Sequence, residues 1–200
     1  MKRCWRRSMF RFFETLCLWE GEVRYLEYHS QRIQRTLGGK ESFRGLELHL
    51  QAMNLPKTGW WKIKLLYDGC GFGEAILTPY EPRMIQSFRL VRSDIDYSSK
   101  FTDRSALEAL LAQRGEADEV IILKGEEITD TSFSNLALWD GEVWLTPQNP
   151  LLAGTARARL IDEGVIKEAR LGERELREAR ALALLNAMMG MRILEKFEIL

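Results

Sequence analysis

Cysteine and histidine are scarce in this chain of 200 residues, which has three cysteines and two histidines. The cysteines, Cys4, Cys17 and Cys70, lie far apart, and no two of them form a Cys-x-x-Cys pair. Their odd number and wide spacing argue against a disulfide framework and against a zinc site. With only His29 and His49 available, a histidine-based metal centre is not expected either.

Long apolar runs and an excess of one charge are also absent. No stretch approaches the roughly 18 apolar residues of a membrane span, and Arg11 and Glu14 interrupt any apolar start of a secretion signal. Basic and acidic residues number 29 each, so net charge gives no reason to expect a nucleic-acid partner. The sequence predicts a soluble cytoplasmic protein without a membrane partner. Its basic start, residues 2–7, has aromatic neighbours and is expected to form a strand.

The hydrophobic content of 46% is enough for a sizeable core. Apolar spacing predicts two short helices in the first half, at residues 28–37 and 43–53, among several strands. Strands and scattered helices continue in the second half, which indicates an α+β architecture. A short polar stretch at 94–99 is expected to link an N-terminal subdomain, residues 1–93, to a C-terminal subdomain, residues 100–200.

Turn residues divide the predicted strands. The glycine-rich segment 69–73 superficially resembles a phosphate loop, but a strand follows it where a dinucleotide site needs a helix, so we expect a hairpin turn. Asp140-Gly141 is expected to form a type I′ turn between two alternating strands. The predicted strands cover residues 10–18, 23–26, 60–67, 74–79, 84–91, 120–123, 136–139, 142–146, 166–171, 181–185 and 191–195. Further helices are expected at 101–114, 155–163 and 173–180.

The second half carries residues whose order points to chemistry. Lys100 follows the linker, and Asp130 and Asn135 stand downstream of it. Gly154-Thr155 opens a predicted helix, where free backbone amides and the helix dipole would both favour a phosphate group. Taken singly, these features indicate little. A lysine before a helix is usually a solvated surface residue, and Thr155 alone predicts a plain helix cap.

As an ordered set, these residues resemble the class IV aminotransferases, which are the fold-type IV enzymes of pyridoxal 5′-phosphate (PLP). The family includes branched-chain aminotransferases, D-amino-acid aminotransferases and aminodeoxychorismate lyases. The resemblance spans about residues 10–193 and implies a small α/β N-terminal part, a pseudo-barrel C-terminal part and a homodimer acting on a small amino substrate. The family pattern corresponds here to Phe13-Glu14-Thr15, His29-Ser30-Gln31-Arg32, Lys100, Thr129-Asp130 with Asn135, Thr146-Pro147 and Gly154-Thr155-Ala156-Arg157.

The resemblance implies catalytic roles for two of these residues. Lys100 would carry PLP as a Schiff base and then move protons, and a lysine in a partly dry, cationic pocket has the lowered pKa that both tasks require. Asp130 would pair with the protonated pyridine nitrogen and keep the ring able to accept electrons. The family usually has glutamate there, so the shorter side chain needs a small backbone shift or a water. His29 is expected to be structural.

The remaining cofactor contacts are implied in the same way. Arg32 would bind the phosphate through its planar guanidinium, and the backbone amides of Thr155 and Ala156 would complete the phosphate site. Leu152 would pack against the ring face. Asn186 would lie on a loop that reaches the phosphate and the substrate carboxylate.

Three functions remain open at this point. Residues 186–191 resemble the Asn-Ala-Leu-Met-Pro-Val turn of aminodeoxychorismate lyases, and residues 100–104 resemble a lyase-type Lys-x-x-Asn-Arg motif. These favour a lyase that releases pyruvate from 4-amino-4-deoxychorismate and forms 4-aminobenzoate for folate synthesis. The alternatives are an aminotransferase of branched-chain or D-amino acids and a non-catalytic protein with this fold. The first domain is short for the family, so some specificity loops are expected to be missing or rebuilt.

Overall fold

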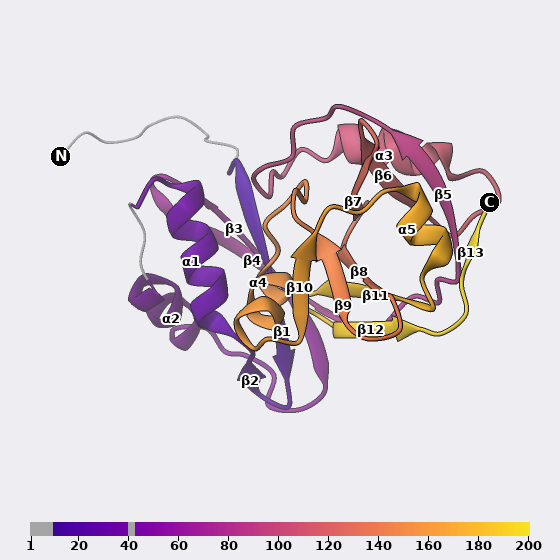
Figure 1. Ribbon diagram of the computed structural model, residues 1–200. Coiled ribbons are helices and arrows are strands. Elements are labelled where there is room, and N and C mark those ends of the chain that lie inside the picture. Colours follow the sequence, from indigo (N-terminus) through magenta and orange to yellow (C-terminus); the bar gives the residue numbers. More distant parts are fainter. Residues whose placement is uncertain (1–9, 40–42) are drawn as a thin grey trace.

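The protein is described by a computed structural model that covers residues 10–39 and 43–200. Within these ranges the strands form two sheets, one from residues 12–79 and one from residues 87–199 (Figure 1). The expected strand at the basic start, and Cys4 with it, lie outside the described residues. Within the described ranges, no helix is long and apolar enough to cross a membrane.

The first sheet is antiparallel and has the strand order β2-β1-β3-β4, with both N-terminal helices on one of its faces (Figure 1). Leu16 and Leu65 are fully buried on this face, against Ile33 and Leu46 of the two helices. The elements are β1 (Phe12–Trp19), β2 (Glu22–Val23), α1 (Leu26–Thr36), α2 (Phe43–Gln51), β3 (Trp60–Asp68) and β4 (Gly71–Pro79).

The second sheet has the order β10-β9-β8-β7-β6-β5-β13, and β11 branches from β8 to pair with β12. Its strands are β5 (Ser87–Arg92), β6 (Glu119–Lys124), β7 (Glu127–Thr131), β8 (Asn135–Trp139), β9 (Trp144–Pro147), β10 (Ile166–Ala169), β11 (Ala181–Asn186), β12 (Gly190–Leu194) and β13 (Glu198–Ile199). The helices of this part are α3 (Ser105–Leu111), a 3₁₀ turn (Ala112–Arg114), α4 (Thr155–Asp162) and α5 (Glu173–Glu178).

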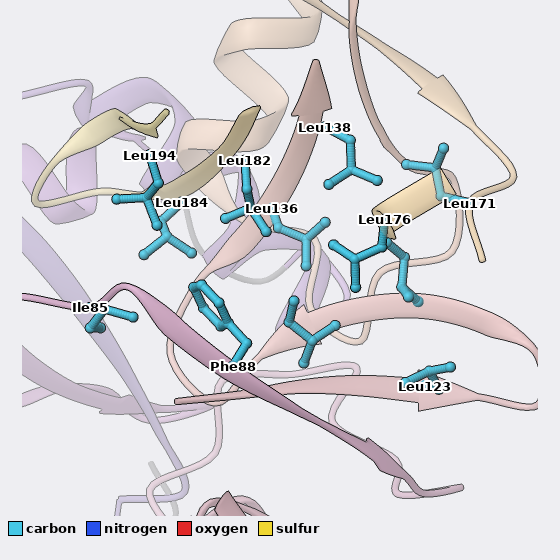
Figure 2. Packing of buried hydrophobic residues seen from close by; sticks show 12 residues of the cluster. Ile85, Phe88, Leu123, Leu136, Leu138, Leu171, Leu176, Leu182, Leu184 and Leu194 are labelled. Carbon is cyan, nitrogen blue, oxygen red and sulfur yellow. The ribbon is translucent and has the colours of Figure 1, made fainter. Parts of the chain in front are cut away.

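The main core fills the interior that this second sheet encloses. Figure 2 shows Phe88 of β5 directed toward leucines of other strands, including Leu136 of β8 and Leu184 of β11. These three side chains have no exposed surface. The mixture of two sheets with short helices confirms the predicted α+β fold.

The chain passes from the first sheet to the second earlier than the sequence predicts. β5 pairs in parallel with both β6 and β13, so the change falls at residues 80–86 instead of in the expected linker at 94–99. Tyr97 of that stretch is itself buried against Leu107 and Val120. Apolar alternation identified the strand near 84–91, but it carries no information about which sheet the strand joins. Sheet membership thus changes before β5, while the predicted subdomains 1–93 and 100–200 stay a prediction.

The two predicted turns have different outcomes. The segment 69–73 closes the β3–β4 hairpin, with Asp68 opposite Gly71, as expected. The turn at Asp140-Gly141 is not type I′, because Trp139 pairs with Trp144 and leaves four residues in the loop. The Asp140 carboxylate accepts the amides of residues 142 and 143, each at 2.8 Å, and so stabilises the longer loop.

Truncation of a core leucine tests this packing. Leu182 is fully buried in the main core, whereas Ile193, opposite Ala183 on β12, is 51% exposed. We expect Leu182→Ala to lower the free energy of unfolding by about 2–5 kcal/mol, since it leaves a cavity, and Ile193→Ala to lower it by less than about 1 kcal/mol. Urea denaturation measures both values, and equal losses would contradict the assignment of the core.

Candidate active site

A cavity of about 490 Å³ lies where the two sheets meet. Its volume falls in the range of small-molecule sites, roughly 300–1,000 Å³. Residues of β1 and β3 contribute to its lining together with residues from the loops of the second sheet. Of the residues predicted from the sequence, Arg32, Lys100, Asp130, Leu152, Thr155 and Asn186 line this cavity. Ala156 is buried next to it and is absent from the lining.

Lys100 is held beside the first strand. Its carbonyl accepts the amide of Phe13 at 3.0 Å, and its Nζ lies 4.7 Å from the centre of the Phe13 ring. Loss of hydration in the cavity lowers the pKa of Lys100 to about 7, and the positive charges of Arg32 and Arg104 act in the same direction. Glu14 opposes this shift. About half of the Lys100 amine is therefore unprotonated, and able to accept a proton, near neutral pH.

Asp130 comes from β7 and is buried. Its Oδ1 accepts the Asn135 side-chain amide at 2.7 Å, and its Oδ2 accepts the Leu152 amide at 2.9 Å. Burial raises the pKa of Asp130 to about 7, although both donors oppose the shift. Such a carboxyl is half-ionised near neutral pH, and a cationic group bound beside it would hold it ionised.

Arg32 belongs to a buried cluster with Glu14 and His29. Glu14 has no exposed surface and accepts Arg32 Nε at 2.9 Å, a second hydrogen bond from Arg32 Nη2, and His29 Nδ1 at 2.7 Å. Burial opposes its ionisation, but Arg32 and His29 outweigh burial and lower the pKa of Glu14 to about 2. The pKa of His29 is lowered by burial, which fits the structural role expected for it.

The start of α4 forms the floor of the site on the side of Asp130. The first hydrogen bond of this helix runs from the Ala158 amide to the Gly154 carbonyl at 3.0 Å. The amides of Thr155 and Ala156 therefore have no acceptor among the residues that the structure describes, and they are available to an anion. A Cβ atom at Gly154 would lie 1.9 Å from Asn135 Oδ1, so only glycine fits there.

Asn186 closes the turn between β11 and β12. Its side-chain oxygen accepts the amides of Met188 at 2.9 Å and Met189 at 3.0 Å. The resulting loop contributes residues 186–189 to the cavity lining. Asn186 thus lies at the site, as predicted. Its carboxamide oxygen is used to stabilise the turn.

Three further residues of the site were given no role from the sequence. Asn135 holds Asp130 and also donates to the Leu152 carbonyl at 2.8 Å. Glu14 orients Arg32, and Arg104 donates to the Ser132 carbonyl at 2.8 Å from within the lining. Glu14 and Asn135 belong to the family pattern quoted above, which was the available signal for them. Arg104 matches the arginine of the lyase-type motif at residues 100–104, which was the available signal for it.

The family model described as amino-transferase class IV matches residues 99–197. An uncharacterized protein of Haemophilus influenzae is 32% identical over 190 residues, which cover 92% of this chain and 100% of that protein. A solved structure from Haemophilus somnus 129pt is 30% identical, with a TM-score of 0.81 over 90% of this chain and 97% of that one. The chain belongs to the class IV aminotransferase family.

Two solved members of this fold carry informative names. The Haemophilus somnus protein is provisionally named a 4-amino-4-deoxychorismate lyase. A hypothetical aminotransferase from Mycobacterium tuberculosis, in a PLP-bound form, matches with a TM-score of 0.71 and 17% identity over 94% of this chain and 81% of that one. The latter likeness shows the fold alone. Membership of the family implies PLP as the cofactor.

The titration of Lys100 tests the electrostatics of the site. We expect its amine to titrate near pH 7 in NMR spectra of the cofactor-free protein, because the cavity disfavours its charged form. Arg104→Met removes one repelling charge and is expected to raise this pKa. The shifted resonance should be missing in Lys100→Met, which is the assignment control. A midpoint near about 10, as for a solvated lysine, would contradict the account.

Proposed function

We propose that this class IV protein is a PLP-dependent lyase that converts 4-amino-4-deoxychorismate to 4-aminobenzoate and pyruvate. The observation that carries the proposal is the convergence of three groups on one cavity. These are the Lys100 amine with its lowered pKa, the buried Asp130 carboxyl and the open amides at the start of α4. This combination matches the three charged or reactive parts of PLP: an aldehyde, a pyridine nitrogen and a phosphate.

The residues present fit the cofactor. Gly154 lets the start of α4 lie directly against Asn135, whose Oδ1 occupies the place of a Cβ atom, and the amides beyond it are free to bind an anion. Arg32 would bind the phosphate, because Glu14 fixes its guanidinium at the cavity wall. Asp130 would accept the pyridinium proton, and Leu152 would pack on the ring. When bound to Lys100, PLP supplies an electron sink for the substrate.

Lys100 then performs the proton transfer that the reaction requires. Its amine would remove the proton from the ring carbon that bears the substrate's amino group. The bond between the adjacent ring carbon and the ether oxygen breaks, the six-membered ring becomes aromatic, and the departing enolpyruvate takes up a proton to become pyruvate. A lysine with a pKa near 7 is mostly neutral at the slightly alkaline end of the physiological range, so it serves as a base without a further activating group.

Two observations favour the lyase over other class IV reactions. The Asn186 turn has the lyase-like sequence noted above, and it lies at the cavity. The Haemophilus somnus structure with the lyase name covers almost the whole chain at 30% identity. An aminotransferase is the alternative, because the family model carries that name and the first proton transfer by Lys100 is common to both reactions. The two differ in the later steps, which depend on the shape of the substrate.

Cofactor uptake and product analysis separate these functions. We expect the purified protein to bind PLP with a visible absorption band that Lys100→Ala abolishes, and to release 4-aminobenzoate and pyruvate in equal amounts from aminodeoxychorismate. Consumption of 2-oxoglutarate with an amino donor, and no pyruvate release, would establish the aminotransferase instead. A wild-type protein that takes up no PLP would contradict both catalytic functions and favour the non-catalytic alternative.

Replacement of Asp130 tests the pyridine contact. Asp130→Asn keeps the size of the side chain but cannot stabilise a protonated ring nitrogen. We therefore expect PLP binding to remain within about tenfold of the wild type, while pyruvate release slows by about a hundredfold or more. The matched control is Asp118→Asn, on an exposed carboxylate outside the lining. An unchanged rate in Asp130→Asn would rule out this role.

A further inference from the structure

Two lysines on β3 line the cavity and have no part in the cofactor contacts proposed above. Lys62 pairs with Cys17 and Lys64 pairs with Thr15 across the β1–β3 ladder. The residues between and beyond them, Ile63 among them, are buried against the helices on the other face. Since successive side chains of a strand alternate between faces, both lysines lie on the cavity face, and both belong to the lining.

Neither lysine is neutralised within the described ranges. No carboxylate lies within ion-pair distance of Lys62 or Lys64, and the Lys64 ammonium lies 4.9 Å from the centre of the Phe13 ring. Two arginines of the lining differ in this respect, because Arg32 is paired with Glu14 and Arg83 with Glu119. The two lysines thus present uncompensated positive charge to whatever occupies the cavity.

Lys64 lies close to Lys100, and this position indicates which anionic group the Lys64 ammonium can bind. Both ammonium groups contact the same Phe13 ring, at 4.9 Å and 4.7 Å from its centre. The charge of Lys64 is also one of those that act on Lys100. An anionic group that is close to an amine reacting at Lys100 would therefore meet Lys64. Among the acids of the lining, Asp130 is engaged with Asn135 and Leu152, and Glu81 is exposed at the rim.

We propose that Lys62 and Lys64 form a subsite for an amino substrate with two carboxylates, with Lys64 binding the carboxylate nearer the reacting amine. This inference rests on the proposed function for the place of the amine. Side chains two apart on a strand are separated by about 6.6–6.8 Å, so the pair addresses two anionic groups on one molecule better than a single group. The cavity accordingly selects dicarboxylates over monocarboxylates.

Binding of two simple probes tests the subsite apart from catalysis. Isophthalate has two carboxylates on one ring and benzoate has one, and neither has an amine that could react. Calorimetric titration of the PLP-loaded protein should show tighter binding of isophthalate. We expect Lys62→Met or Lys64→Met to raise the Kd of isophthalate about tenfold and to leave much less preference over benzoate. Lys64→Arg should restore most of the affinity.

The matched control is Lys57→Met, because Lys57 is an exposed lysine of the same part of the chain and lies outside the lining. It should bind isophthalate as the wild type does, and thermal denaturation should show that all variants are folded. If the proposed function is wrong, the protein will take up no PLP. The same titrations on the cofactor-free protein would then still show whether Lys62 and Lys64 bind two carboxylates. Equal Kd values for the two probes, or isophthalate affinities in both lysine variants within twofold of the wild type, would overturn the proposal.

Discussion

The site depends on the Lys100 amine, which lies in the cavity partly removed from water and has no ion-pair partner among the described residues. Lys100 points into the cavity, and its nearest charged neighbours in the lining include the cations Arg32 and Arg104. A charge in such a place is unfavourable, and the amine reduces the cost by releasing its proton near neutral pH. The same environment that disfavours the charge makes the nitrogen a nucleophile and a base. The other residues of the site maintain these partly dry, cationic surroundings of Lys100.

Hydrogen bonds among the surrounding polar groups allow the fold to bury charged side chains close to Lys100. Glu14 offsets the buried charge of Arg32 in the first part of the chain, and Asn135 with the Leu152 amide holds Asp130 in the second. Buried charges of this kind are tolerated only when their hydrogen bonds are satisfied. Glu14 and Asp130, the two buried acids near Lys100, are therefore each hydrogen-bonded to other partners and do not form an ion pair with it.

Much of the fold could be predicted from the sequence, because apolar alternation marks strands such as β1 and β3 directly. β7 was missed because Thr129, Asp130 and Thr131 are polar and nevertheless buried. Their hydrogen bonds explain this, since Thr129 Oγ1 donates to the Ile122 carbonyl at 2.8 Å and Thr131 bonds with Ser134. A strand that carries a functional acid departs from the apolar pattern for that reason. The local sequence pattern also could not predict that β5 joins the second sheet, because this depends on its pairing with β6 and β13.

The candidate site could be predicted as an ordered set of residues but not as a geometry. Lys100, Asp130 and Thr155 were identified through the family resemblance, and the structure brings all three to one cavity. The sequence could not show that Arg104 reaches the same cavity or that Asn135 fills the space beside Gly154. The expected homodimer stays a prediction, and so does the role of each cofactor contact.

The most direct measurement of the central claim is the chemical location of the cofactor. The protein loaded with PLP is reduced with borohydride, digested, and its peptides are identified by mass spectrometry. The account predicts one pyridoxyl phosphate group, attached to the peptide that contains Lys100 and absent when the protein is reduced without PLP. Attachment to a different lysine, or recovery of the Lys100 peptide in unmodified form from a fully loaded sample, would contradict it.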